Sequence, residues 1–242
     1  MPTPQAAPDP APVRITGHRG AMGVEPENTL RSFRRAVADG CDEVELDLRR
    51  TRDGHLVLVH DADLLRTTGT PGKVAELTLA DIRALDPDPE TRVPTFAEAV
   101  AVIPVPIQAE LKDPAAVEPL ARVLDAEPAL AARTLVISFK PDRLLEIRRL
   151  RPGTPVGLIT HRATETAAEL VAAARAAEAE TVVCGLPGLT AAHVDACHAA
   201  GLRITTWSVN EVPELRRVLA MGVDGVTTDH PGELAAALRS PV

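Results

Sequence analysis

The feature that most constrains the fold of this chain is a regular alternation between short aliphatic runs and longer amphipathic stretches. Eight runs rich in Val, Ile and Leu begin near residues 14, 43, 106, 134, 156, 181, 203 and 223. Each is followed by a stretch with helical spacing, and these stretches stop near a Gly or Pro, as helices commonly do. Eight successive strand and helix units in 242 residues predict an α/β fold, a (β/α)8 TIM barrel, because an open doubly wound sheet usually has fewer strands.

One interval between predicted strands, the second, is about twice as long as the others. It contains the run TRDGHLVLVHD, in which the pair Asp53-Gly54 is typical of a tight turn between two strands. A polar segment follows from residue 62 to about residue 92. We therefore expect a small insertion after the second strand, made of a hairpin and an excursion over the barrel mouth.

Charge and composition limit the partners of the chain. Its formal net charge is -8, so its general surface should repel nucleic acid and anionic membranes, which proteins hold mainly with Lys and Arg. Aromatic residues make up 2% of the chain, too few for base stacking to supply affinity. We expect a small-molecule substrate and no nucleic-acid partner, and the oligomeric state stays open.

The chain as a whole is expected to form one cytoplasmic domain. Residues 1–12 are rich in Pro and Ala and predict a flexible N-terminal tail, which leaves residues 13–242 for the barrel. No apolar run approaches the ~20 residues that cross a bilayer, and the start lacks the basic and apolar regions of a signal peptide, so we expect no stable membrane anchor. The three cysteines are far apart without C-x-x-C spacing, which favours buried thiols over disulfides or zinc.

Four ionisable side chains lie on two successive core strands of the predicted barrel. Because side chains alternate along a strand, Glu45 and Asp47 point the same way, as do Glu110 and Lys112. If these residues face the interior at the C-terminal end of the barrel, three carboxylates converge there. A salt-bridged strand face is the alternative, but two such pairs on buried strands favour a bound metal. An all-oxygen ligand set suits Mg²⁺ or Ca²⁺ better than Zn²⁺.

Two histidines are expected at the same mouth. His18 and Arg19 follow the first predicted strand, and the planar fork of an Arg suits a pair of phosphate oxygens. His60 and Asp61 end the hairpin, so that a second imidazole returns to the mouth and could complete an acid/base pair. The other five histidines are interpreted as ordinary surface or core residues: His55, His161, His193, His198 and His230.

Four further residues face the mouth by position. Trp207 ends the seventh predicted strand and is either a core residue that plugs the barrel or a wall for a ligand. Asp229 follows the eighth strand, and Ser138 and Lys140 lie at the end of the fourth. The roles of these last three residues stay open at this stage.

Several longer motifs run through the predicted barrel in a fixed order. They are HRGAMGVEPENTLRSFRRAVADG from His18, VELDLRRTRDGHLVLVHDADLLRTT from Val44, VPTFAEAV from Val93, AELK from Ala109 and, near the C-terminus, TWSVN and GVDGVTTDHP. Together these motifs resemble the glycerophosphodiester phosphodiesterase family over nearly the whole predicted domain. The resemblance implies metal-dependent hydrolysis of glycerophosphodiesters to sn-glycerol 3-phosphate and an alcohol, a reaction of lipid and glycerol metabolism. The ion implied is Mg²⁺ or Ca²⁺, with Mn²⁺ as a third candidate.

The same resemblance implies a role for each candidate site residue. On this basis Glu45, Asp47 and Glu110 are metal ligands, His18 and His60 the catalytic acid/base pair, Arg19 and Lys112 the phosphate contacts, Trp207 the residue that packs on the glycerol side, and Asn28 a supporting residue that organises the loop after the first strand.

Several alternatives remain open on the sequence. The excursion after the second strand is compact, whereas larger relatives carry a longer insertion, and this leaves the alcohol side of the substrate undefined. A phosphodiesterase of the lysophospholipase D type is one alternative function, and a non-catalytic barrel that binds a phosphate ligand is another. The sequence also leaves open which histidine is the acid, and whether water or the glycerol 2-hydroxyl attacks phosphorus.

Overall fold

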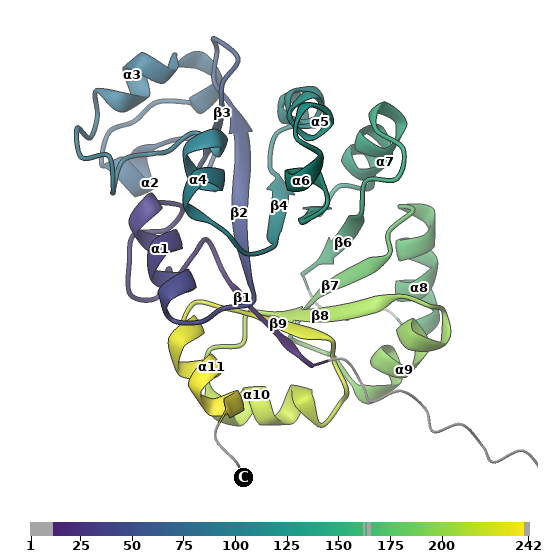
Figure 1. Ribbon diagram of the computed structural model, residues 1–242. Coiled ribbons are helices and arrows are strands. Elements are labelled where there is room, and N and C mark those ends of the chain that lie inside the picture. The colour runs from purple at the N-terminus through teal and green to yellow at the C-terminus, as the bar shows by residue number, and fades with distance from the viewer. Residues whose placement is uncertain (1–11, 162, 164–165, 240–242) are drawn as a thin grey trace, which may run out of the picture.

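The structure is a closed barrel of parallel strands with helices around it (Figure 1). It is a computed structural model that describes residues 12–161, 163 and 166–239, so the predicted tail lies outside the described residues except for Pro12. The strands are β1 (Arg14–Gly17), β2 (Glu43–Arg50), β3 (Leu56–Leu58), β4 (Ile107–Leu111), β5 (Thr134–Ser138), β6 (Val156–Thr160), β7 (Thr181–Gly185), β8 (Arg203–Trp207) and β9 (Gly225–Thr228).

Pairing of the first two strands closes the barrel. The sheet runs in the order β1-β9-β8-β7-β6-β5-β4-β2-β3, and β1 also pairs with β2. All neighbours are parallel except β2 and β3, which are antiparallel. The described part of the chain therefore confirms the predicted eight-stranded TIM barrel and the predicted hairpin after the second strand.

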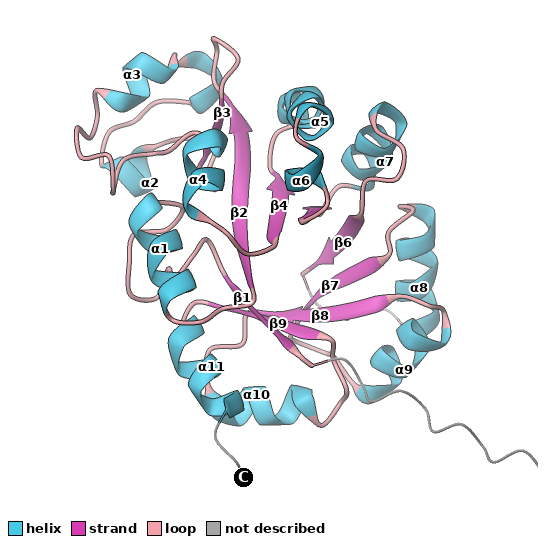
Figure 2. Ribbon diagram, in the orientation of Figure 1, coloured by secondary structure: helices cyan, strands magenta, loops and turns pink. Residues whose placement is uncertain are grey.

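Figure 2 shows the helices on the outside of the strands. They are α1 (Leu30–Ala38), α2 (Leu65–Thr68), α3 (Leu79–Arg83), α4 (Phe96–Val102), α5 (Val117–Ala126), α6 (Pro128–Ala131), α7 (Pro141–Leu150), α8 (Ala167–Ala176), α9 (Ala191–Ala199), α10 (Val212–Leu219) and α11 (Pro231–Arg239), with the 3₁₀ turns η1 (Val74–Glu76) and η2 (Pro114–Ala116). Thr78, Thr95 and Thr166 begin α3, α4 and α8 with capping boxes, which satisfy backbone N–H groups that a helix start leaves unpaired.

Side-chain alternation on the strands separates two environments. On β2, Leu46 and Leu48 are fully buried in the main hydrophobic core, where strands meet the surrounding helices. The intervening Glu45 and Asp47 are also buried and face the barrel interior. The parallel register pairs Asp47 with Glu110 of β4, which places both carboxylates in one layer. This is the inward convergence that the alternating pattern predicts.

The excursion between β3 and α4 has a small hydrophobic core of its own. That core contains Val57, Val59, Leu64, Val74, Leu79 and Ile82. Figure 1 shows α2 and α3 grouped with β3 at one side of the barrel. Of the described residues 59–92, His60 lines the cavity at the barrel mouth. The excursion therefore stands beside the mouth and not over it, because its apolar side chains pack on one another.

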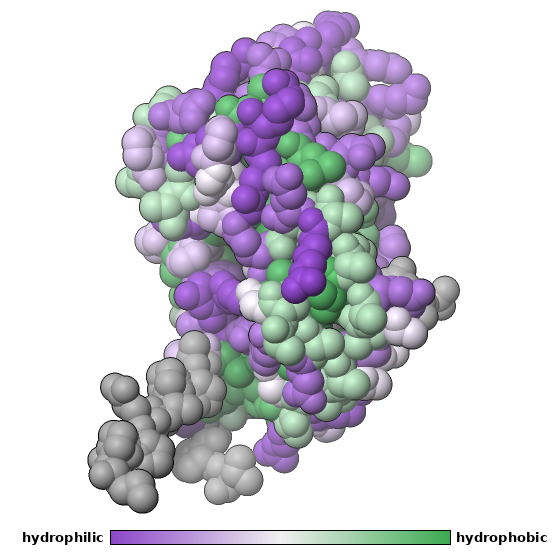
Figure 3. Space-filling view, turned by 90° about the vertical axis from the view of Figure 1, so that its right-hand side faces the viewer, coloured by the Kyte–Doolittle hydropathy of each residue, from purple (hydrophilic) through white to green (hydrophobic). Residues whose placement is uncertain are grey.

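The outer surface mixes both kinds of side chain. Figure 3 shows one face, on which hydrophilic residues dominate the upper half and pale hydrophobic areas in the lower half are interrupted by strongly hydrophilic residues. The large hydrophobic side chains exposed among the described residues are Val24, Leu65 and Leu145. In the same part of the chain, every helix is too short or too polar to span a lipid bilayer.

Candidate active site

A cavity of about 390 Å³ opens at the C-terminal end of the barrel strands. Its lining includes seven of the nine residues singled out from the sequence: His18, Arg19, Glu45, His60, Glu110, Lys112 and Trp207. The other two, Asp47 and Asn28, are almost completely buried behind the cavity wall, with exposed fractions of 1% and 2%. The loops of this face are where barrels of this type carry their active sites.

Three buried carboxylates converge at the base of this cavity. Each of Glu45, Asp47 and Glu110 offers an oxygen atom within 4.8 Å of the others. Burial and the charge of Asp47 raise the pKa of both glutamates, to about 7 for Glu110. The Oδ1 atom of Asp47 is buried without a hydrogen-bond partner among the described residues. Crowded acidic oxygens, one of them without a hydrogen bond, fit a hard divalent cation, which would neutralise their charge.

Two cations border the carboxylates. The Nζ atom of Lys112 lies 2.8 Å from Glu110 and 3.4 Å from Asp47. The side chain of Arg19 contacts Asp47 through Nε at 3.1 Å and donates from Nη1 to Glu27 at 2.9 Å. Burial alone would raise the pKa of Asp47, but the charges of Lys112 and Arg19 hold it below its usual value. Asp47 is therefore the carboxylate of the three that stays ionised most readily.

The loop after β1 is held in an unusual backbone conformation. Arg19 and Asn28 both have positive φ angles, 48° and 56°, a region that residues other than Gly rarely occupy. The Asn28 side chain donates to Asp47 Oδ2 at 2.8 Å and accepts from the Asp47 backbone N–H at 3.2 Å. The backbone N–H of Arg19 donates to Glu45 at 2.9 Å. These contacts tie the loop to β2 and fix where the Arg19 side chain begins.

His18 is held by an acid that the sequence left without a role. Its Nδ1 atom lies 2.6 Å from Asp229 Oδ1, so Nε2 is the nitrogen left for a ligand. Asn210 in turn donates to Asp229 Oδ2 at 2.7 Å and accepts from its backbone N–H at 2.9 Å. Burial would raise the pKa of Asp229, but the bond to His18 and the amide of Asn210 keep it low. Asn210 lies in the motif TWSVN and Asp229 in GVDGVTTDHP, so both belong to motifs that carry the family resemblance.

His60 is held on the opposite side by residues of the hairpin and excursion. Its Nδ1 atom lies 2.8 Å from Asp61 Oδ1, and Arg49 donates twice to its backbone carbonyl. The pKa of His60 is lowered, chiefly by burial. The charge of Asp47 and the hydrogen bond with Asp61 oppose this shift, and the charges of Lys112 and Arg19 add to it. His60 is therefore biased toward its neutral form.

Arg66 of α2 joins the two sides of the site. It donates to both oxygens of Glu27, at 2.6 and 2.8 Å, and from Nε to Asp61. Glu27 is the partner of Arg19, and Asp61 is the partner of His60. The chain of contacts thus runs from the guanidinium of Arg19 to the imidazole of His60 through one bridging Arg. The sequence analysis missed Glu27 and Arg66, although both lie in motifs quoted for the family resemblance.

The far wall of the cavity is apolar and aromatic. Ile137, Ile159 and Val183 form a small cluster there, against which Phe139 and Trp207 pack. The Trp207 indole donates to backbone carbonyls of β6 and β7.

Of the histidines interpreted as ordinary surface or core residues, one is an exposed residue that also lines the cavity. His161 lines the same cavity and stacks on Phe139 with ring centroids 4.3 Å apart, because it continues the inward face of β6. The remaining histidines lie outside the cavity lining, as expected: His55, His193, His198 and His230. The cysteines Cys41, Cys184 and Cys197 are buried and not joined by disulfides.

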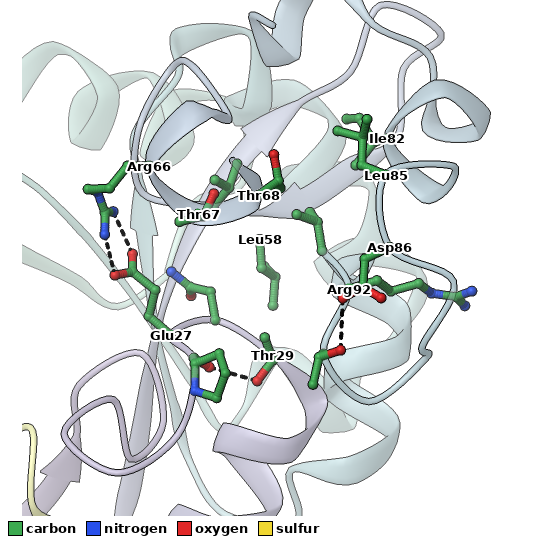
Figure 4. Close-up of a pocket in the computed structure, with 15 residues that line it drawn as sticks. Glu27, Thr29, Leu58, Arg66, Thr67, Thr68, Ile82, Leu85, Asp86 and Arg92 are labelled. Atoms are coloured by element: carbon green, nitrogen blue, oxygen red, sulfur yellow. Dashed lines mark hydrogen bonds and ion pairs between the residues drawn. The ribbon is translucent and has the colours of Figure 1, made fainter. Parts of the chain in front are cut away.

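A second cavity of about 390 Å³ lies between the loop after β1 and the excursion. Figure 4 shows Arg66 directed at Glu27 on one side of it and Leu58, Ile82 and Leu85 on the others. Its lining includes no histidine and none of the three clustered carboxylates. The barrel mouth, where ionisable groups converge, is therefore the stronger candidate for catalysis.

Comparison with known proteins gives one consistent result. The model of the glycerophosphoryl diester phosphodiesterase family matches residues 18–233. A probable glycerophosphodiester phosphodiesterase 1 of Mycobacterium tuberculosis is 33% identical, covering 93% of this chain and 92% of its own length. A glycerophosphodiester phosphodiesterase of Caldanaerobacter subterraneus is 29% identical, covering 93% of this chain and 97% of its own.

Solved structures agree on the fold. A protein from Silicibacter pomeroyi superposes with a TM-score of 0.79 at 32% identity, covering 93% of this chain and 92% of its own. An Oleispira antarctica phosphodiesterase, solved with its product sn-glycerol-3-phosphate, has a TM-score of 0.84 at 24% identity, covering 94% of this chain and 97% of its own.

Proposed function

The chain belongs to the glycerophosphoryl diester phosphodiesterase family of hydrolases, and from that membership we propose that it hydrolyses glycerophosphodiesters to sn-glycerol 3-phosphate and an alcohol. The observation that carries the proposal is the convergence of a three-carboxylate cluster, two histidines and two cations on one cavity. A site that only bound a phosphate ligand would need the cations but not a second held histidine.

Glu45, Asp47 and Glu110 would hold one divalent cation, Mg²⁺ or Ca²⁺ by the oxygen chemistry of the ligands, with Mn²⁺ as a third candidate. When bound, such an ion supplies positive charge where the phosphoryl oxygens become more negative. Asn28 supports this role, because its two bonds to Asp47 orient that carboxylate and leave Oδ1 without a hydrogen bond. Ligand orientation by such outer contacts is a general feature of metal sites.

Arg19 and Lys112 contact the phosphodiester in this proposal. Both are already fixed by carboxylates, so their charges are oriented before the substrate arrives. Preorganised charge of this kind stabilises a transition state more than a flexible cation does. Trp207 and the neighbouring aliphatic side chains would cover the glycerol moiety and exclude water from that side.

His60 is proposed as the proton acceptor and His18 as the proton donor of the first step. The lowered pKa of His60 keeps it neutral near pH 7, and Asp229 can compensate the charge of a protonated His18. His60 Nε2 takes the proton of the glycerol 2-hydroxyl as its oxygen attacks phosphorus, and His18 protonates the departing alkoxide. Water then opens the cyclic 1,2-phosphate with the two roles exchanged, which yields glycerol 3-phosphate and restores both histidines.

A product assay tests the proposal. Glycerophosphocholine and a divalent cation should give glycerol 3-phosphate and choline, with a transient cyclic 1,2-phosphate in single-turnover reactions. The 2-deoxy analogue should lose kcat far more than affinity, because it lacks the attacking oxygen. Release of phosphocholine would overturn the proposal, because the bond between phosphate and glycerol would then be the one that is broken. Faster turnover of lysophosphatidylcholine than of glycerophosphocholine would favour a phosphodiesterase of the lysophospholipase D type. Comparable kcat for the 2-deoxy analogue, without a cyclic species, would mean that water attacks directly.

A further inference from the structure

The cavity carries two cations that the proposed mechanism does not use. Lys140, at the start of α7, and Arg143, one turn into that helix, both line the barrel mouth. The guanidinium of Arg143 donates to the carbonyl of Leu111 at 2.6 Å. Neither side chain forms an ion pair with any residue in the described ranges. This differs from Arg19 and Lys112, whose charges are each matched by carboxylates.

The acid nearest in sequence to Lys140 and Arg143 is Asp142, which lies between them in the first turn of α7 but is not part of the cavity lining. The carboxylates that line the cavity are Glu45 and Glu110, both members of the metal cluster. Asp113 follows β4 nearby, but it accepts from the backbone N–H of Ala115 at 2.9 Å and makes no ion pair with Arg143 in the described structure. This corner of the mouth therefore carries two positive charges that form no ion pair within the described residues.

Two further features favour an anion at this corner. The helix α7 has ten residues and begins here without a side-chain cap, so the positive end of its dipole adds to the field. Pro141 contributes no N–H group, and the acid Asp142 in the first turn offsets part of this field. The aromatic wall beside it could in principle hold a quaternary ammonium group. The Nζ atom of Lys112, however, already lies 5.6 Å from the centre of the Phe139 ring, and like charges would repel a second cation there.

We propose that Lys140 and Arg143 form a subsite for an anionic group on the alcohol half of the substrate. The substrates preferred are then glycerophosphodiesters whose alcohol carries a phosphate or a carboxylate, and a cationic alcohol such as choline is the disfavoured case. The inference rests on the proposed function, because it names the alcohol that the same site accepts. It also gives a physical reason for the choice of alcohol, which the compact excursion leaves undefined.

Three substrates that differ in the charge of the alcohol test the proposal on the full chain. They are glycerophosphocholine, glycerophosphoglycerol and glycerophosphoglycerol with a terminal phosphate, compared by kcat/KM at one ionic strength with saturating divalent cation. We expect the phosphate-bearing substrate to exceed glycerophosphoglycerol by about tenfold or more, and glycerophosphocholine to be the poorest. In Lys140→Gln the preference for the anionic alcohol over the neutral one should fall several-fold, and in Lys140→Gln/Arg143→Gln it should disappear.

The control is Arg149→Gln, on the same helix but paired outward with Glu146, which should leave the preference unchanged. Lys140 is exposed, so its variant should fold even if loss of the Arg143 bond to Leu111 disturbs the double variant. An equal loss on all three substrates would overturn the inference, because the cations would then serve the shared phosphodiester. A wild-type preference for choline would also overturn it. Absence of hydrolysis of every substrate would instead refute the proposed function itself.

Discussion

The two halves of the barrel mouth are built on the same strand alternation but differ in how their inward side chains are held. On the half formed by β9, β1, β2 and β4, ionisable groups meet partners of opposite charge, as His18 meets Asp229 and Arg19 meets Glu27. On the half formed by β5 to β8, the inward positions carry Ile137, Ile159 and Val183, and aromatic rings cover them.

The difference indicates that the two halves of the mouth have separate roles. The charged half holds its groups in position before a substrate arrives, which favours chemistry on a phosphoryl group. The apolar half supplies a dry wall, which favours selection of the substrate. Each half also has one exception to its pattern: Oδ1 of Asp47 has an ion pair with Lys112 but no hydrogen bond on the charged half, and Lys140 and Arg143 lie at the edge of the apolar half. We infer that the first exception serves the bound metal ion and the second serves an anionic group of the substrate.

Removal of the metal should give the largest effect on the charged half. With chelator in excess, turnover should fall by ~10³-fold or more, since a metal can contribute several kcal/mol of transition-state stabilisation. Addition of Mg²⁺, Ca²⁺ or Mn²⁺ should raise the Tm of the wild type, because an ion that binds only the folded state stabilises it.

Glu110→Gln should lose most of this metal-dependent rise in Tm while keeping the fold. The matched control is Glu43→Gln, on β2 and also buried but outside the carboxylate cluster; it should lower stability yet retain the rise. Full activity in excess chelator would contradict the prediction that turnover depends on a metal ion at the charged half.

Loss of either histidine should give the next largest effect. His18→Ala and His60→Ala should each lower kcat by at least ~10²-fold, the usual scale for a positioned acid or base. The double variant should be little worse than the poorer single variant, because groups that act as a unit are not additive. His198→Ala, which changes a partly exposed histidine paired with Asp224, should retain activity. Wild-type turnover in either mouth variant would reject the acid/base assignment.

The pH profile separates the two histidines. A proton acceptor must be neutral, so kcat/KM should fall about tenfold per pH unit below the pKa of His60. Because burial lowers that pKa from its ordinary 6.5, the midpoint of the acid limb should lie below pH 6.5. The bond from Asp61 raises the pKa of His60, so Asp61→Asn should move the limb to lower pH. A limb above pH 7, or one that persists in His60→Ala, would assign it to another group.

The fold could be predicted in detail because its signals are local. The period of two in Val44 to Leu48 identifies an inward and an outward face within one strand, and the eight aliphatic runs give the order of the barrel. The position of the excursion could not be predicted in the same way. Val57, Leu64 and Ile82 reveal their common core only when the chain is folded, and nothing in their spacing says that they pack on one another instead of over the mouth.

In the site, too, features with a local sequence signal could be predicted and long-range contacts could not. Glu45, Asp47 and Glu110 could be identified because alternation and strand order place them together. The contacts of His18 and of the Arg66 bridge could not, because the residues that meet are distant in sequence: His18 and Asp229 are 211 positions apart, and Glu27 and Arg66 are 39 apart. The position of His161 at the cavity could not be predicted for a related reason, since the inward face of β6 extends one residue beyond its aliphatic run.

Loss of the Arg66 bridge should have a moderate effect. Arg66→Gln frees Glu27 and Asp61 together, so both Arg19 and His60 lose a fixed partner, and kcat should fall by about tenfold, the scale seen for outer contacts of an active site. Arg66→Lys should restore little, because an ammonium group cannot bond both carboxylates as a planar guanidinium does. Arg52→Gln, which removes an exposed pair with Asp81 in the same region, is the control. Unchanged kcat with a lowered Tm would make the bridge structural only.

The smallest effect is expected on the apolar half. Trp207→Leu keeps an apolar side chain but removes the ring that faces the cavity and the N–H that donates to the Thr160 and Val183 carbonyls. If Trp207 only covers the glycerol moiety, ground state and transition state lose the same contact, so KM should rise about fivefold while kcat stays within about threefold. Loss of these two hydrogen bonds should cost about 1–2 kcal/mol of stability, which chemical denaturation would measure. Trp207→Phe should keep most of the affinity at the same cost in stability. A fall in kcat as large as that of the histidine variants would contradict the separate roles of the two halves, because the apolar half would then take part in the chemical step.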